Sequence, residues 1–418
     1  MLHQLSVRGF KSLRDVHVDL ARLVVVFGPN AAGKSNLLEA LVLLSRLVRE
    51  RTLDGAFEEG LRGRPVAAFS FGPGGLEELL THDRSTLSLT ARVGKAEVAD
   101  LEYSVEVGIR PRSGELSLED ERLQSLTRVG ERLGDAVIGR SEDGTKLRVR
   151  RKGRGSYPFE ERPGLHHTIA SNMQFSGEGF EKLDDLRRDV GTWRATYLDP
   201  RDAMRAARPP REVTDIGDRG QWLVPFLHRL QEDELHRNEL RAIVRATRVV
   251  IPAIEEIRTE LVRSRGEVEL HVKQDGIWMS ARVVSEGTLR VLALCAMAAN
   301  PFSRGLIAFE EPENGVHPRR IEQITGILLA AARAPRQVVV TTHSPLVVGD
   351  VLRRIRAGEV AADQVRLLIA SSGTGGTRIR GFDPVGPLFD DAEIDAALTD
   401  RDDADRVQAI LRRGWLDD

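Results

Sequence analysis

The stretch VVVFGPNAAGKSNLL, residues 24–38, constrains the fold of this chain more than any other. It contains Gly-x4-Gly-Lys-Ser, the spacing of a phosphate-binding loop, in which backbone N–H groups and a lysine converge on phosphate oxygens. The residues before it, Leu23 to Phe27, are continuously apolar, as expected of a strand buried on both faces of a parallel sheet. Apolar residues then recur at helical spacing from Leu37 to Val48. The glycines therefore sit between a strand and a helix N-terminus that attracts anions.

Lysine usage adds an independent argument for the loop. Of the 61 Lys and Arg residues only 7 are Lys, so a basic surface position in this chain is almost always Arg. Lys34 departs from that habit, and a compact ammonium that reaches the β- and γ-phosphates explains the exception. We predict nucleotide contacts from the nine loop residues Gly28, Pro29, Asn30, Ala31, Ala32, Gly33, Lys34, Ser35 and Asn36.

Length, charge and cysteine content limit the class of protein. A chain of 418 residues can bury a large core, as one large domain with insertions or as two domains. Its single cysteine, Cys295, lies in an apolar run and is expected to be buried, which excludes an internal disulfide or a paired-cysteine metal site. No apolar run approaches the ~18 residues that span a bilayer, so we expect a cytoplasmic protein without membrane contact. The net charge of −2 gives no global basic field for nucleic acid.

The first half of the chain is predicted to contain several strands and one helix. Two strands (LSVRGF and LVVVF) precede the loop, and a helix is predicted from about Ser35 to Arg51. Alternating segments (TLSLTARV, EYSVEVGIR, KLRVRR) predict antiparallel strands between residues 86 and 151. Residues 153–180 predict a long loop, TWRATYLDPRD a short strand, and residues 221–250 a helical arm too short for a coiled coil.

Two adjacent carboxylates end a later buried strand, in LIAFEEPEN. Glu310 and Glu311 are predicted at the sheet edge where open α/β sheets bind ligands, and neighbours on an extended strand point to opposite faces. Glu310 is predicted to hold Mg²⁺ with the Ser35 hydroxyl, directly or through water, because Mg²⁺ prefers oxygen ligands. Glu311 is predicted to orient and deprotonate the attacking water.

A histidine closes the next buried strand, in VVVTTHSP. His343 is predicted at the same edge, where its ring can donate a hydrogen bond to the γ-phosphate. A histidine after a strand is by itself most often an ordinary core or surface residue. The phosphate loop and the paired glutamates make it a candidate catalytic residue.

In order and spacing these motifs resemble those of the ATP-binding-cassette (ABC) ATPases, and among them the soluble RecF, SMC and OLD-type proteins. The resemblance covers most of the chain: GFKSLRDVHVDL, GPNAAGKSN (Walker A), YLDPRD, SEGTLR (signature), LIAFEEPENGVHP (Walker B and the following loop) and TTHSP (switch histidine). EEPENGVHP with SEGTLR in place of LSGGQ is similar to predicted ATPases of the OLD-like group, many of them encoded in bacterial anti-phage systems.

The resemblance implies an α/β fold, an ABC-ATPase head with a mixed sheet, an antiparallel β insertion and a short helical arm. It implies ATP and Mg²⁺ as cofactors and a head-to-tail homodimer that encloses two ATP molecules. Ser285 and Gly287 would then contact the γ-phosphate held by the other chain, although a Ser and a Gly before a helix also fit a simple helix cap. We divide the chain into a Walker A lobe with the antiparallel region (1–200), a helical arm (201–265), a lobe with signature, Walker B and switch histidine (266–370), and an acidic C-terminal segment (371–418).

Two positions depart from the family pattern. No glutamine lies between Asn36 and Asp100, so the residue equivalent to the family's Mg²⁺-sensing glutamine is unassigned. Glu310 stands where most relatives have Asp, one methylene shorter, which favours direct contact with the metal. We expect hydrolysis in spite of both departures.

Three functions fit these motifs. The first is an ATP-driven switch or clamp in DNA repair or anti-phage defence, acting with a separate effector protein. The second is an OLD-type nuclease, disfavoured because the 75 residues after His343 lack the acidic pattern of a Toprim site. The third is a transporter ATPase, disfavoured by the signature variant and the antiparallel segments.

Two charged segments leave alternatives open. The strand KLRVRRKGRGSY is the one segment suited to a nucleic-acid backbone, but a solvated edge strand explains it equally well. Its cations are Lys146, Arg148, Arg150, Arg151, Lys152 and Arg154. The Asp-rich cluster from Asp390 to Asp405 is expected to be a solvated surface.

Overall fold

A six-stranded, mostly parallel sheet forms the centre of the computed structural model, which describes residues 1–418 except 59–60, 95–99, 153–158, 383–404, 406–407 and 409–418. Its strands in spatial order are β10 (Arg194–Thr196), β14 (Leu306–Glu310), β15 (Gln337–Thr342), β3 (Leu23–Phe27), β16 (Val365–Gly373) and β17 (Gly376–Phe382). β3 lies between β15 and β16, parallel to both, while β17 pairs antiparallel with β16. The strand that leads into the phosphate loop therefore has a neighbour on each side.

The alternating side chains of β3 divide the interior into two cores. Val24 and Val26 pack in the core shared with the first helix and the antiparallel sheet, whereas Leu23, Val25 and Phe27 pack in the core shared with the later helices. All five residues are buried, which confirms the prediction of a strand covered on both faces.

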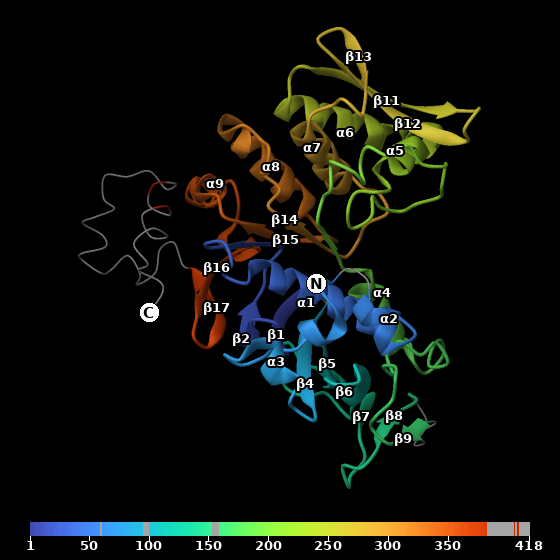
Figure 1. The fold of residues 1–418 in the computed structure, drawn as a ribbon, viewed down its shortest axis with the longest axis vertical. Coiled ribbons are helices and arrows are strands. Elements are labelled where there is room, and N and C mark those ends of the chain that lie inside the picture. The colour runs from blue at the N-terminus through green and yellow to red at the C-terminus, as the bar shows by residue number, and fades with distance from the viewer. Residues whose placement is uncertain (59–60, 95–99, 153–158, 383–404, 406–407, 409–418) are drawn as a thin grey trace.

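An eight-stranded antiparallel sheet forms the layer below the central sheet in Figure 1. Its strands in spatial order are β2 (Leu13–Asp19), β1 (Leu2–Phe10), β4 (Ser85–Val93), β5 (Asp100–Arg110), β6 (Glu115–Leu126), β7 (Ile138–Arg140), β8 (Leu147–Val149) and β9 (Phe159–Glu161). The predicted antiparallel region is confirmed, but the count of two strands before the loop is wrong, because β2 is a third. β2 is an edge strand whose alternate residues are exposed, so its apolar content is low.

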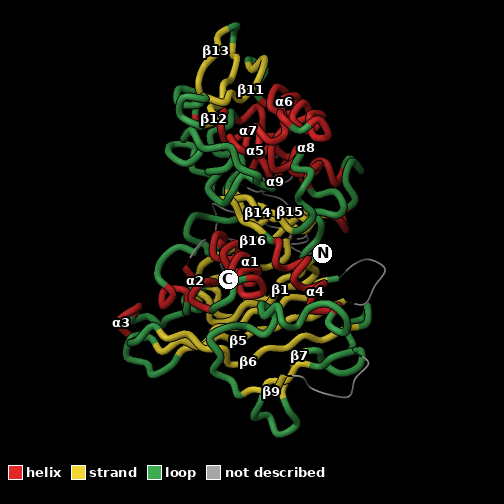
Figure 2. The backbone as a smooth tube through the Cα atoms, turned by 90° about the vertical axis from the view of Figure 1, so that its right-hand side faces the viewer, coloured by secondary structure: helices red, strands yellow, loops and turns green. Residues whose placement is uncertain are grey.

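Nine α-helices and a small sheet complete the described part of the chain. The helices are α1 (Lys34–Arg49), α2 (Leu53–Glu58), α3 (Gly75–Leu79), α4 (Glu181–Asp189), α5 (Leu223–Glu232), α6 (Arg237–Val250), α7 (Glu286–Ala298), α8 (Ile321–Ala331) and α9 (Pro345–Arg356). The three-stranded sheet consists of β11 (Ile254–Val262), β12 (Glu267–Gln274) and β13 (Ile277–Ser280). Figure 2 shows these strands with α5 to α8 at one end of the molecule and the antiparallel sheet at the other. In the described ranges, none of the helices is long and apolar enough to cross a bilayer.

The predicted helical arm is interrupted, one predicted boundary falls in the turn of a hairpin, and another falls inside a strand. The helix expected over residues 221–250 breaks at Asp233, whose side chain accepts a hydrogen bond from the Leu235 N–H and starts a separate turn. The boundary at 265/266 lies within the β11–β12 hairpin, and the boundary at 370/371 lies within β16. The chain on either side of each boundary therefore belongs to one packed unit.

The two charged segments differ in how far the structure describes them. In the basic strand, Lys146 pairs with Glu160 at 3.0 Å, Arg148 pairs with the same carboxylate, and Arg150 pairs with Asp135. These partners favour a solvated strand over a nucleic-acid contact, but β8 pairs with β7 on one side and β9 on the other, so the expectation of an edge strand is wrong. Arg154 lies outside the described residues. The Asp-rich cluster lies outside the described residues, apart from Asp405.

Candidate nucleotide site

The phosphate loop joins β3 to the N-terminus of α1, where the first N–H groups of the helix have no partner within it. Gly33 has φ 85°, a left-handed conformation that favours glycine. A Cβ atom on Gly33 would lie 1.9 Å from the Thr377 hydroxyl oxygen, and one on Gly28 would lie 2.2 Å from the Ala370 carbonyl oxygen. Because β16 and β17 approach the loop this closely, a side chain would not fit at either Gly28 or Gly33.

Lys34 is buried, with 6% of its surface exposed, and its ammonium lies across the loop. Its Nζ donates to the carbonyl oxygens of Gly28, at 2.9 Å, and Pro29, at 2.8 Å. Burial lowers the pKa of Lys34, opposed by the charges of Glu311 and Glu310. The Lys34 ammonium is thus held by the loop carbonyls within the electrostatic influence of Glu311 and Glu310, and its contact with phosphates stays a prediction.

Ser35 and Glu310, the two predicted metal ligands, are in direct contact. The Ser35 hydroxyl donates to Oε1 of Glu310 at the carboxyl end of β14. In the described part of the chain, no group of three or more His, Cys, Asp or Glu side chains is arranged to hold a metal ion. A hydroxyl and a carboxylate side by side fit Mg²⁺ nevertheless, because Mg²⁺ in nucleotide sites takes one or two protein oxygens and completes its shell with phosphate and water.

Glu311 and Glu310 contact different residues, as predicted, but the alternation of side chains along a strand is not the reason. Its φ of 45° places it outside the extended conformation, so strand alternation does not separate the two carboxylates. The Glu311 carboxylate accepts from Asn314 Nδ2 at 2.7 Å and lies 2.9 Å from His343 Nδ1. Burial favours a higher pKa, but the hydrogen bonds from Asn314 and His343 and the charge of Lys34 bring the Glu311 pKa below its ordinary value. Glu311 is therefore a carboxylate near neutral pH, able to accept a hydrogen bond from water.

His343 and Glu313 take part in hydrogen bonds between the ends of β14 and β15. His343 follows β15, and its side chain is 46% exposed, so the ring is accessible to a ligand. Glu313, buried at 6% exposure, accepts from the Thr342 hydroxyl, and burial raises its pKa. We did not predict roles for Glu313 or Asn314, although their spacing in EEPEN is visible in the sequence.

A buried ion cluster behind Ser35 was also not predicted. Glu39, with no exposed side-chain surface, lies one turn beyond Ser35 on α1 and accepts from Lys11 Nζ and Arg62 Nε. Burial opposes the charge of Arg62, but hydrogen bonding and attraction to Glu39, and then the charge of Glu310, raise the Arg62 pKa. Arg62 thus lies between Asn36 and Asp100, where no glutamine occurs, and its charge is attracted by the carboxylate of Glu310. We call Lys11, Glu39 and Arg62 the Glu39 cluster.

The signature residues lie at the start of α7. Ser285 is the N-cap of this helix, and its hydroxyl accepts from the Thr288 N–H at 3.1 Å. A Cβ atom on Gly287 would lie 2.3 Å from the Gly315 carbonyl oxygen, in the loop after Walker B. Both residues thus have a role within their own chain, and their predicted contact with the nucleotide of a second chain stays a prediction.

All the predicted site residues except Ser285 and Gly287 of the signature lie together in one site. The loop residues 28–36, Glu310, Glu311 and His343 meet at the carboxyl edge of β3, β14 and β15. This edge brings together N–H donors and an ammonium that can bind phosphates, an oxygen pair that can bind a metal, and a carboxylate–imidazole pair that can hydrogen bond to water.

The fold is similar to solved heads of SMC proteins. A structure described as the SmcHead bound to the C-winged helix domain of ScpA has 12% sequence identity, covers 92% of this chain and 98% of that chain, and has a TM-score of 0.53. The SMC head domain from Thermotoga maritima has 14% identity, covers 91% and 99%, and has a TM-score of 0.42. The first of these similarities confirms the predicted head fold. No curated protein shows significant sequence similarity to the chain.

The sequence also matches a family model over two long segments. The model is described as an AAA domain, putative AbiEii toxin, Type IV TA system, and it matches residues 23–163 and 181–349. These ranges include the phosphate loop, the signature, Walker B and His343. The predicted absence of a Toprim nuclease stays a prediction. The chain belongs to this family of AAA-type P-loop ATPases and has the fold of an ABC/SMC-like head.

Proposed function

We propose that the protein binds and hydrolyses ATP, and that nucleotide-dependent dimerisation of the head controls a separate effector protein in a defence or repair system. The observation that carries this proposal is the convergence of one lysine and two side-chain pairs at one sheet edge: Lys34 on the loop, Ser35 with Glu310, and Glu311 with His343. Each of the three matches a task that phosphoryl transfer to water requires.

In this proposal the chain positions the phosphates and one water. The loop N–H groups and Lys34 hold the β- and γ-phosphates, and Ser35 and Glu310 hold Mg²⁺, which when bound neutralises phosphate charge. Glu311 accepts a proton from the attacking water, and Asn314 holds its carboxylate in place. His343 stabilises the γ-phosphate from the neighbouring strand.

The control of an effector is supported by the comparisons, and dimerisation of the head is supported by the surface. The matching family is described as a putative toxin of a toxin–antitoxin system, and the similar SMC head is bound to a separate winged-helix domain. Val283, two residues before the signature Ser285, is 70% exposed. An exposed valine there suits an interface that forms when two heads enclose ATP.

Nucleotide binding tests the basis of the proposal. Lys34→Ala removes the ammonium but keeps the loop backbone, so we expect at least a tenfold loss of affinity for a fluorescent ATP analogue with Mg²⁺. Lys146→Ala, which removes an exposed lysine of the basic strand, serves as the matched control and should bind like wild type. Equal affinities in wild type and Lys34→Ala would exclude the phosphate-loop assignment.

A further inference from the structure

Two neighbouring threonines end β15, and their hydroxyl groups have different surroundings. Thr341 and Thr342 are both buried. The Thr341 hydroxyl has no hydrogen-bond partner among the described residues. The Thr342 hydroxyl, in contrast, donates to Oε1 of Glu313 and accepts from the Ser344 N–H at 2.9 Å. The hydroxyl of Thr342 therefore connects the end of β15 both to the loop after β14 and to the start of α9.

The contact with Ser344 fixes the backbone on both sides of His343. A threonine hydroxyl that accepts from the N–H two residues later closes a tight turn. Thr342 precedes His343 and Ser344 follows it, so the turn encloses the histidine. The turn also leads directly into α9, because Ser344 is the N-cap of this helix and Pro345 its first residue. The direction in which the His343 side chain leaves the backbone therefore depends on the Thr342 hydroxyl.

Glu313 determines the orientation of that hydroxyl. A hydroxyl group has one proton to donate and two lone pairs that accept. Because the Thr342 proton is donated to Glu313, the lone pairs are left to accept from the Ser344 N–H. The backbone carbonyl of Glu313 accepts from the Val316 N–H at 3.0 Å, which closes a turn in the loop after β14. Glu313 is thus held by its own loop while its side chain holds Thr342.

The Glu313 carboxyl group can perform this task without a charge. Its second oxygen, Oε2, is buried and has no hydrogen-bond partner in the described part of the chain. Burial raises the pKa of Glu313, opposed by the hydrogen bond from Thr342. Burial favours the protonated acid, which keeps a carbonyl oxygen that accepts from Thr342. An amide oxygen at the same position could therefore replace it.

Two glutamates of one loop thus act on His343 in different ways. Glu311 lies 2.9 Å from Nδ1 and restricts rotation of the ring. Glu313 acts on the backbone through Thr342 and restricts the direction of the Cα–Cβ bond. A ring that must reach a γ-phosphate oxygen needs both restrictions, because a displacement of about 1 Å costs as much as 10²-fold in rate.

We propose that Glu313 is a positioning residue for His343, and that it acts through the Thr342 hydroxyl and the Ser344 N–H rather than by contact with ATP, metal or water. Loss of its hydrogen bond lets the histidine leave its position while the phosphate loop and the Ser35–Glu310 pair stay intact. The effect on turnover rests on the proposed ATPase function, whereas the effect on the histidine ring does not.

Two substitutions break this hydrogen bond from opposite ends. Glu313→Met keeps the length of the side chain without a strong acceptor, and Thr342→Val replaces the hydroxyl by a methyl group. Each should lower kcat at least tenfold and change KM for ATP less than twofold, because the γ-phosphate loses a positioned group. The double variant should be no slower than the slower single variant, since both remove the same bond. Glu313→Gln keeps an oxygen acceptor and should recover most of the turnover lost in Glu313→Met.

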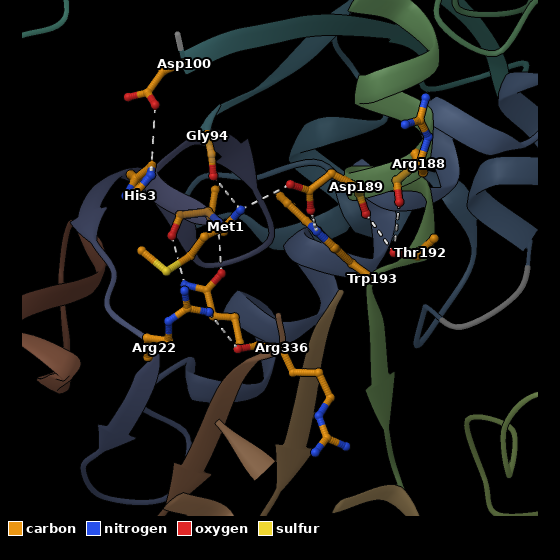
Figure 3. Close-up of polar contacts among 12 residues, drawn as sticks. Met1, His3, Arg22, Gly94, Asp100, Arg188, Asp189, Thr192, Trp193 and Arg336 are labelled. Atoms are coloured by element: carbon orange, nitrogen blue, oxygen red, sulfur yellow. Dashed lines mark hydrogen bonds and ion pairs between the residues drawn. The ribbon is translucent and has the colours of Figure 1, made fainter. Parts of the chain in front are cut away.

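Two other threonines provide matched controls. Thr341→Val makes the same change at the adjacent buried hydroxyl, which makes no hydrogen bond within the described ranges, and should turn over like wild type. Thr192→Val removes a hydroxyl that donates to the Asp189 carbonyl oxygen at 2.8 Å, as Figure 3 shows. Thr192 precedes β10 and lies at the end of the parallel strands opposite to the nucleotide site. Loss of a bonded hydroxyl there should also leave turnover unchanged.

The ring of His343 gives a measurement that does not depend on hydrolysis. Magnetic resonance of nucleotide-free protein with isotope-labelled histidine reports the ring, and the signal is assigned by its absence in His343→Gln. The His343 signal should shift in Glu313→Met and in Thr342→Val and should coincide with wild type in Thr341→Val. A shifted signal in a protein that hydrolyses no ATP would support the positioning role and refute the ATPase.

Two results would overturn the proposal. The first is a His343 signal and a kcat that stay at wild-type values in Glu313→Met and Thr342→Val. The second is a loss of turnover in Glu313→Gln equal to that in Glu313→Met, because the carboxyl proton or charge, and not the acceptor for Thr342, would then be what turnover requires.

Discussion

The carboxylate of Glu311 lies 2.9 Å from Nδ1 of His343, and this hydrogen bond links the residues that follow β14 and β15. A histidine that donates through Nδ1 presents its other nitrogen to the ligand. The same contact fixes one carboxylate oxygen, and Asn314 holds the other. The geometry thus holds both groups in place before a nucleotide arrives.

Glu311→Gln should bind ATP but hydrolyse it at least ~10²-fold more slowly, because an amide cannot accept the proton of water. Steady-state phosphate release and ATP affinity measured on the same preparation check this result. Glu359→Gln makes the same chemical change on an exposed pair with Arg353 and should leave both quantities unchanged. Wild-type turnover in Glu311→Gln would assign the base to another residue.

Turnover should depend on dimerisation through the surface near the signature. Gly287→Glu is an unsuitable test because a Cβ atom there meets the Gly315 carbonyl oxygen at 2.3 Å. Val283 is 70% exposed, so Val283→Glu should leave the fold and ATP binding of the monomer intact but reduce turnover at least tenfold. Wild-type activity per chain should also rise with protein concentration across a hundredfold dilution series. A flat profile, with Val283→Glu fully active, would show that one chain hydrolyses ATP alone.

Loss of the central charge of the Glu39 cluster should destabilise the protein. Glu39→Gln leaves Lys11, whose side chain is only 12% exposed, without its anion, and we expect a loss of about 3 kcal/mol in the free energy of unfolding. The urea midpoint measures this loss, and the exposed Glu359→Gln variant should stay within about 0.5 kcal/mol of wild type. A change below about 1 kcal/mol would mean that the cluster contributes little net stability.

Buried Glu121 should make stability depend on pH. Burial raises the Glu121 pKa from 4.5 to about 7, even though hydrogen bonds from the Ala170 and Ile169 N–H groups and from Tyr103 favour its carboxylate. Between pH 4.5 and 7 the native protein therefore binds more protons than the unfolded chain, and this group makes stability fall as pH rises. A pKa change of this size corresponds to about 3 kcal/mol.

The test compares urea midpoints at pH 5 and pH 7.5 in wild type and Glu121→Gln. The variant should be less stable at both pH values, because its amide N–H2 would face a backbone N–H, and it should lack the part of the pH dependence that Glu121 contributes. If both proteins show the same pH dependence, Glu121 does not titrate in this range.

Features carried by short local patterns could be predicted from the sequence. The apolar run of β3, the glycine spacing and the helix after it specify the loop within thirty residues. The strand ends at Glu310 and His343 follow from similar runs, and parallel neighbours bring them to one edge. β6 was not predicted, because its segment LEDERL interrupts the alternation, and Glu121 within it is a charged residue on the buried side.

Contacts between distant residues could not be predicted. Nothing local to Lys11 or Arg62 indicates that both meet Glu39 inside the protein, since a single sequence carries no information on pairs. The same holds for Ser12, whose hydroxyl lies between Asn36 of the loop and Thr377 of β17. These partners depend on how the sheets pack, which periodicity does not specify.

The position of β3 between two late strands affects how the protein must be made. On a ribosome, the phosphate loop emerges early, but its strand gains its neighbours only when residues 337–342 and 365–373 follow. The close approaches of Ala370 to Gly28 and of Thr377 to Gly33 are therefore among the last contacts to form. Until then the nascent chain exposes a strand of five apolar residues with both edges open, a segment that pairs readily with other chains. Gly28 and Gly33 of the phosphate loop therefore meet the groups that exclude a side chain there only after Ala370 and Thr377 have been synthesised.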